Sequence, residues 1–211
     1  MLATRMRMAP VLGPVELTDD GDNAIQDTGF GTDTHTHDDQ SSTGPVSVLA
    51  IFWRDADDIA LSGVTWGGAT VAILVQAHRA NAGAAIAIIK GAQTGDVVLT
   101  FADIVNDTSL TVMSLKNLRS RSAIDTDTST HASGGASLTS LASPGVGGIR
   151  IAAWTNDDDT NTVTWTGATE ISDVDGSSHR FSAAYDLGDD NGTITANGGS
   201  DEEAICGVSL R

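Results

Sequence analysis

From Val46 onward, short apolar runs alternate with turn-forming residues, and no long stretch follows the 3.6-residue period of a helix. The run VSVLAIFW (46–53) is apolar almost throughout, which is typical of a strand covered on both faces. In VTW (64–66), apolar and polar residues alternate, as on a strand with one buried face. Further apolar runs follow at intervals of about 8–12 residues, the spacing of a sandwich or barrel. The pattern predicts an all-β protein, in which we favour a strand over a short helix for the Ala-rich run AAIAIIKGAQ (84–93).

The second half of this region repeats the first. Val48–Trp53 corresponds to 149–154, and an acidic loop follows each copy. The peptide VTWGGAT (64–70) then returns as VTWTGAT (163–169). The other matched positions, in the same order along the chain, are His78-Arg79 with His179-Arg180, Gly95 with Gly192, and Ser114-Leu115-Lys116 with Ser209-Leu210-Arg211.

These matches indicate a duplication of residues 46–116 and 147–211, joined by a connection, 117–146, with one strand around Ser137–Leu141. We predict a jelly-roll-like β-sandwich built from two duplicated Greek-key-like halves. Two tandem small sandwiches are the alternative, although an all-β unit of this size is marginally stable alone. The sandwich would span residues 45–211.

Residues 1–44 differ from the rest of the chain. They contain two prolines, few apolar residues and a long Asp/Thr/Gly-rich tract that lacks any period. We predict an extended N-terminal arm that is flexible alone and ordered only when a partner or the body of the protein holds it. Its first residues lack the apolar core of a signal peptide, so neither a signal peptide nor a transmembrane segment is expected.

The charge balance narrows the possible partners. The formal net charge is −17, and 24 of the 28 acidic residues are Asp. Such a chain repels nucleic acid and anionic membranes, so neither is an expected partner. High Asp, only two lysines and a core of small residues resemble proteins of extreme halophiles, in whose brine the Debye length is about 3 Å. An ordinary acidic marine or extracellular protein is the alternative. The single cysteine, Cys206, excludes an intrachain disulfide and lies in an alternating run, so we expect a buried thiol.

The block VSVLAIFWRDADDIALSGVTWGGAT (46–70) resembles a β-sandwich domain of tailed-virus virion proteins, also found in some prokaryotic surface proteins. The matching pieces are Val48–Trp53, Val64–Thr70 and Gly95–Phe101, followed by LTVMSLKNL (110–118). The Ala-rich third strand and the N-terminal arm depart from that pattern. The resemblance implies a virion domain without catalytic activity, used in capsid decoration, a turret, a fibre or a tail.

His35 and His37 are the sharpest candidates for chemistry. In an H-x-H pair on a strand, both imidazoles lie on one face. Spikes and fibres of tailed viruses use such pairs, one per chain, for a six-nitrogen site on a threefold axis, and imidazole suits several transition metals. The alternative is a solvated loop. No other cofactor is expected.

Three further patterns have structural explanations. The acidic loops Asp55–Asp58 and Asn156–Asp159, with Asp173-Val-Asp175-Gly176, lack the ligand spacing of a calcium loop and are typical of solvated turns. The repeated His-Arg pairs have no accompanying nucleophile and are expected at strand ends. The tryptophans could form a carbohydrate platform, but their repeated positions favour packing in the core.

No enzyme motif occurs, so we expect no catalytic residues. The leading hypothesis is a structural virion protein on the capsid surface, assembled in the host cytoplasm and anchored by residues 1–44 to the major capsid protein or another virion protein. A homo-oligomer, either a trimer or a pentamer, would suit such positions. The alternative is a receptor- or glycan-binding fibre, tail or cell-surface module with a host-surface receptor. A hydrolase is the least favoured hypothesis.

Overall fold

The computed structural model describes residues 13–22, 26–54, 57–132, 135–157, 162–176, 179–188, 192–199 and 201–211, and within them the side chains outside 22–32. All regular structure in this part of the chain is antiparallel β-sheet, which confirms the all-β prediction. No helix there has the length and apolar character to cross a bilayer.

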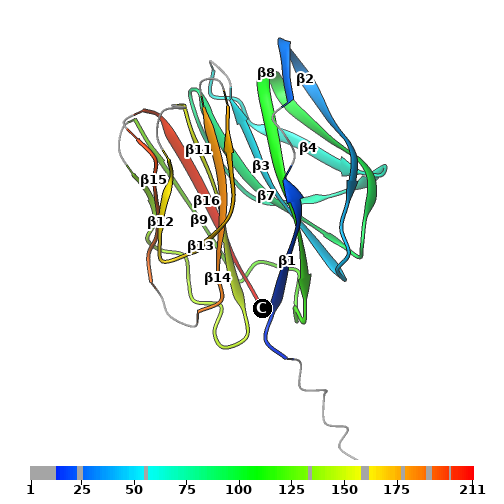
Figure 1. Ribbon diagram of the computed structural model, residues 1–211, viewed down its shortest axis with the longest axis vertical. Helices are drawn as coiled ribbons and strands as arrows, with labels where there is room; N and C mark the ends of the chain where they lie inside the picture. Colours follow the sequence, from blue (N-terminus) through cyan, green and yellow to red (C-terminus); the bar gives the residue numbers. More distant parts are fainter. Residues whose placement is uncertain are drawn as a thin grey trace, which may run out of the picture.

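The first half of the chain forms one sheet (Figure 1). Its strands are β1 (Glu16–Asp22), β2 (Gln26–Ser41), β3 (Val46–Arg54), β4 (Leu61–Trp66), β5 (Ala69–Thr70), β6 (Ala72–Arg79), β7 (Ala82–Lys90) and β8 (Thr94–Lys116). Strand β8 belongs to two layers of this sheet. Its first part, 94–101, pairs with β4 and β2, whereas its last part, 107–116, pairs with β3 and β1.

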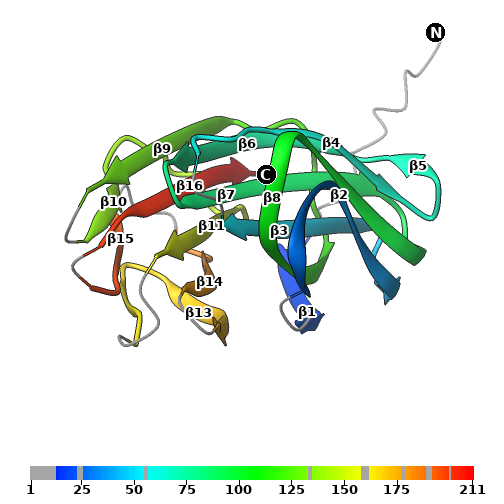
Figure 2. The ribbon, with the colours of Figure 1, turned by 90° about the horizontal axis from the view of Figure 1, so that it is seen from above.

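The second half forms two sheets. Its strands are β9 (Asp125–His131), β10 (Ala136–Leu138), β11 (Ile149–Asn156), β12 (Thr164–Thr166), β13 (Thr169–Asp175), β14 (Arg180–Asp186), β15 (Ile194–Asn197) and β16 (Glu203–Leu210). The larger sheet has the order β13-β14-β11-β16-β9, and the smaller one has the order β10-β15-β12. The two halves lie side by side in Figure 2, with the larger sheet of the second half against β3, β6 and β7 of the first.

Three apolar cores separate four layers of strands. One core lies inside the first half, between β4 with the start of β8 and β3 with β7. A second lies inside the second half, between its larger and smaller sheets. The third lies between the halves, and strand β3 shows how it forms. Leu49, Ile51 and Trp53 point into the first core, while the alternate residues Val48, Ala50 and Phe52 point into the core between the halves.

This arrangement explains the unbroken apolar runs in the sequence. All eight residues of β11 and of β16 are buried, because each strand has an apolar core on both faces. Each half therefore has a core of its own. The halves also share a core, which adds the apolar burial that a unit of this size lacks alone.

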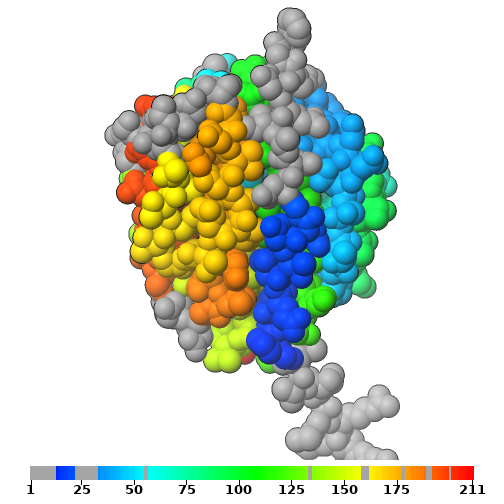
Figure 3. Space-filling view, in the orientation of Figure 1, coloured from blue at the N-terminus to red at the C-terminus, as the bar shows by residue number. Residues whose placement is uncertain are grey.

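The predicted arm and connection supply edge strands to the two halves. In the first half, β1 and β2 pair with the last and first parts of β8. In the second half, β9 pairs with β16 and β10 pairs with β15, at the corresponding edges. The predicted strand near 137–141 overlaps β10, whereas β9 was not predicted. Strands β1 and β2 lie on the surface in Figure 3, with β1 beside β13. The body of the protein therefore holds residues 16–22 and 26–41 of the predicted arm.

Candidate functional site

His35 and His37 lie on β2 and point into the first core, while Thr34 and Thr36 are exposed. His35 Nε2 lies 2.9 Å from the Val105 carbonyl oxygen, which can only accept, so this nitrogen donates. His37 Nε2 lies 3.0 Å from Thr108 Oγ1. Val105 lies where β8 turns from one layer into the next, and Thr108 lies just after that turn. The pair therefore fastens β2 to the bend of β8.

Each imidazole faces the interior of its own chain, whereas a site on a threefold axis would need both at a surface between chains. Among the described residues, no three His, Cys, Asp or Glu side chains are grouped to hold a metal ion. The metal site between three chains stays a prediction, since a single chain does not test it. Burial, and secondarily the charge of His35, lowers the pKa of His37 to about 4. His37 is therefore neutral at pH 7.

We expect His37 to make the protein sensitive to acid. Its pKa is about 4 in the folded chain against an ordinary value of 6.5, so stability is lost as the pH falls from 6.5 to 4. At about 1.4 kcal/mol per unit of pKa, the loss is on the order of 3 kcal/mol. Urea unfolding of the His37→Gln variant should show a correspondingly smaller decrease in the free energy of unfolding between pH 7.5 and pH 4. The exposed His131 serves as control, and the His131→Gln variant should show the same decrease as the wild-type protein. An equal decrease in all three proteins would contradict the assignment to His37.

A second polar cluster joins the two halves at one end of their shared core. Arg54 Nε donates to Asp157 Oδ1 at 2.7 Å, and Arg54 Nη1 lies 3.8 Å from Asp107 Oδ2. The buried His179 places Nδ1 3.7 Å from the same Asp107 oxygen. Burial raises the pKa of Asp157, and the hydrogen bond and charge of Arg54 oppose that rise. The cluster connects β3 and β8 of the first half to the segments flanking β11 and β14 of the second.

Other acidic side chains of the suspected calcium loops also contact cationic or imidazole groups of the chain. His78 Nδ1 lies 2.5 Å from Asp58 Oδ1. Arg180 donates through Nε to Asp173 at 2.6 Å, and its Nη1 lies 3.8 Å from Asp175. These contacts favour the structural interpretation of the loops. Asp55, Ala56, Asp158 and Asp159 of the same loops lie outside the described residues.

The two His-Arg pairs do not occupy equivalent places. His78 and Arg79 end β6, whereas His179 precedes β14 and Arg180 begins it. His78 is partly exposed and His179 is buried. This match in the sequence therefore does not correspond to a match in the fold, and the structure does not bring the two histidines into one site.

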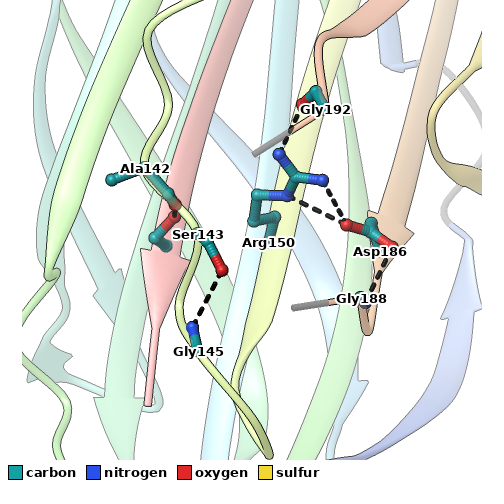
Figure 4. Close-up of polar contacts among 8 residues, drawn as sticks. Ala142, Ser143, Gly145, Arg150, Asp186, Gly188 and Gly192 are labelled. Atoms are coloured by element: carbon teal, nitrogen blue, oxygen red, sulfur yellow. Dashed lines mark hydrogen bonds and ion pairs between the residues drawn. The ribbon is translucent and has the colours of Figure 1, made fainter. Parts of the chain in front are cut away.

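Arg150 is the most deeply buried cation of the described residues, with 1% of its surface exposed. Figure 4 shows its guanidinium between Asp186 and Gly192. Nε donates to Asp186 Oδ2 at 2.9 Å, Nη2 donates to the same oxygen at 2.5 Å, and Nη1 donates to the Gly192 carbonyl at 2.5 Å. The corresponding cross-strand pair in the first half is apolar, Leu49 with Ala87. An Arg inside the run IRIAAW, opposite an Asp, was the signal that could have revealed this pair.

We predict that Asp186→Ala destabilises the protein by about 3 kcal/mol, because it removes the carboxylate from a buried guanidinium. The double variant Arg150→Leu with Asp186→Ala copies the apolar pair of the first half. It should recover most of that loss, since apolar residues replace a buried ion pair at little cost. A double-mutant cycle by urea unfolding measures both effects. Losses that simply add, with no recovery in the double variant, would contradict the prediction.

Glu203 is a further buried carboxyl group that sequence reasoning missed. It is 0% exposed, and its carboxylate accepts a hydrogen bond from the Asn156 amide at 3.2 Å. Burial raises its pKa to about 7, and the hydrogen bond from Asn156 opposes the rise. The group joins β16 to β11. Its position at the start of an apolar strand, EAICGVSL, gave no sign of this role.

The tryptophans are core residues, as the repeat predicted. Trp53, Trp66 and Trp154 are at most 1% exposed, and Trp165 packs partly buried against the core of the second half. The indole N–H of Trp53 donates to the Ile59 carbonyl at 2.9 Å, and that of Trp165 donates to Ser182 Oγ at 2.9 Å. The three buried rings are not available to stack on a sugar. Cys206 is likewise a buried thiol, as predicted.

The clusters described above share one property: each joins strands or layers through paired polar groups. No family model matches the chain, and neither the curated proteins nor the solved structures contain a significant match to it. The geometry of the chain itself is therefore the basis for any functional conclusion.

Proposed function

We propose that this chain is a non-enzymatic structural protein of a tailed virus, displayed on the capsid as a decoration or turret protein. The peptides that resemble virion domains occupy β3, β4, β5 and β8, so the likeness rests on strands of the first sheet. A body of packed sheets suits a displayed part, and its acidic surface suits exposure to brine. The virus would then infect a halophilic host.

The observation that carries the proposal is that the N-terminal residues join the packed sheets at one end, at Gly13 and Pro14. Strands β1 and β2 are integrated in the first sheet, so the segment that would anchor the chain precedes Gly13. Pro14 and Gly13 lie beside Asn117, whose amide donates to the Pro14 carbonyl at 2.9 Å. An anchor that leaves from one end of the body would hold the rest of it away from the capsid.

We further infer that the halves are duplicated jelly rolls, β1–β8 and β9–β16. In the first half, one layer has the order β1-β8-β3-β7 and the other has the order β2-β8-β4. In the second half, the matching layers have the orders β9-β16-β11-β14 and β10-β15-β12. Trp66 pairs with Val97 as Trp165 pairs with Ala196. Strand order and pairing of this kind support a jelly-roll topology. The duplicated unit would then include both the predicted arm and the predicted connection.

Mass spectrometry of purified particles tests the proposal. Hundreds of copies per particle are expected for a decoration protein and tens for a turret. Absence of the chain from particles would refute the virion role.

The anchoring claim needs a short deletion. Removing residues 1–44 would also remove β1 and β2 and expose one edge of β8 along both of its parts, so loss of attachment could then result from a damaged fold. Deleting residues 2–12 leaves the described strands intact. We expect this variant to fold with an unchanged unfolding midpoint and to be depleted from particles at least tenfold. Attachment equal to that of the full chain would contradict N-terminal anchoring.

A further inference from the structure

One end of the molecule collects segments that are distant in the sequence. We call it the basic end and define it by residues 13–16, 116–124, 143–148 and 209–211. Its segments are joined by backbone hydrogen bonds, from Ser120 N–H to the Arg211 carbonyl at 2.6 Å and from Ile124 N–H to the Ser209 carbonyl at 2.8 Å. Figure 1 shows the end of β16 close to the start of β1 at this end.

The basic end carries four exposed cations: Lys116, Arg119, Arg121 and Arg211. None of them forms a salt bridge within the described residues, although Glu16 lies opposite Lys116 in the pairing of β1 with β8. The less exposed arginines behave differently. Arg54, Arg150 and Arg180 are all held by aspartates inside the fold. On a chain of net charge −17, a group of unpaired cations is a distinct surface.

Exposed apolar side chains accompany these cations. Ile124 is 49% exposed and Val146 is 76% exposed, which makes them two of the four large hydrophobic residues exposed in the described chain. The Arg211 guanidinium lies close to Gly145, with Nη1 3.7 Å from the position that a Cβ would take there. Apolar groups beside arginines are typical of protein interfaces, which are enriched in Arg.

We propose that the basic end is the docking face of this chain and that its occupant is an acidic protein surface on the particle. This inference rests on the proposed virion role and specifies the chemistry of the attachment. Charge complementarity selects an acidic partner, and the exposed apolar groups select a protein over a hydrated polyanion. The residues before Gly13, which include Arg5 and Arg7, continue the chain from this same end.

Two other polyanions fit less well. A nucleic acid or an anionic membrane presents a dense, extended field of negative charge, and the acidic remainder of this chain would be repelled from it. A protein surface with a local acidic patch avoids that repulsion, because at molar salt only charges in direct contact interact appreciably. Arginine is suited to such contacts, since its guanidinium binds a carboxylate through two parallel hydrogen bonds.

The test uses particles assembled with the full chain and with two matched single variants. Arg121→Glu changes the basic end, whereas Arg79→Glu makes the same charge change at the turn between β6 and β7, at the other end of the strands. We expect at least tenfold fewer copies of the first variant per particle and no change for the second, with equal unfolding midpoints in solution. Equal copy numbers of both variants would overturn the docking face. Absence of the unmodified chain from particles would instead refute the virion role itself.

A zero-length carbodiimide cross-link identifies the occupant. The reagent joins carboxylates to amines, and Lys90 and Lys116 are the only lysines of the chain. Cross-links from Lys116 to Asp or Glu of another virion protein are expected. Cross-links from Lys116 to a second copy of this chain, and none to another protein, would overturn the proposed occupant. The proposed occupant would also be overturned if the purified chain bound duplex DNA or phosphatidylserine vesicles, and if Arg121→Glu removed that binding while Arg79→Glu left it unchanged.

Discussion

The fold depends on the apolar core that the two halves share. Each half is a small sandwich whose own core is filled by residues such as Leu49 and Ile51, and units of this size are marginal alone. Between the halves, the rings of Phe52 and Phe181 stack with centroids 5.6 Å apart and planes 12° apart. Near them, Thr155 Oγ1 donates to the Gly83 carbonyl at 2.7 Å. The same strands that line the shared core carry the two outer cores on their other faces, so its loss would affect every layer.

The halves resemble each other in pairing and differ in what fills equivalent positions. Taking Trp53 as equivalent to Trp154, the ring of Phe52 corresponds to the methyl group of Ala153 in the shared core. Arg150 with Asp186 likewise replaces an apolar pair of the first half, at the edge of the second core. The ring of Phe52 stacks on the ring of Phe181 across the shared core, so the two halves contribute different side chains to it.

The sequence predicted strands where the hydrophobic pattern is strong: VTWGGAT covers the end of β4 and β5, and VTWTGAT covers β12 and the start of β13. It did not predict that Gln26–Ser41 and Asp125–His131 are strands, because both are rich in Asp and Thr and owe their pairing to the open edges of β8 and β16. The H-x-H pair was recognised, and its burial was not, since the pattern alone does not say which face of a strand is covered. The basic end was invisible because its cations are spread along the chain from Lys116 to Arg211.

In the proposed role, this construction separates attachment from display. The layered body needs all of its strands to be stable, and attachment is left to the basic end and the residues before Gly13. Hydrogen exchange measured by mass spectrometry on Phe52→Ala tests the central dependence most directly, since the substitution should remove about 3 kcal/mol from the shared core. The account predicts faster exchange in β11 and β14 of the second half as well as in β3 and β7 of the first. Faster exchange confined to the first half would contradict it.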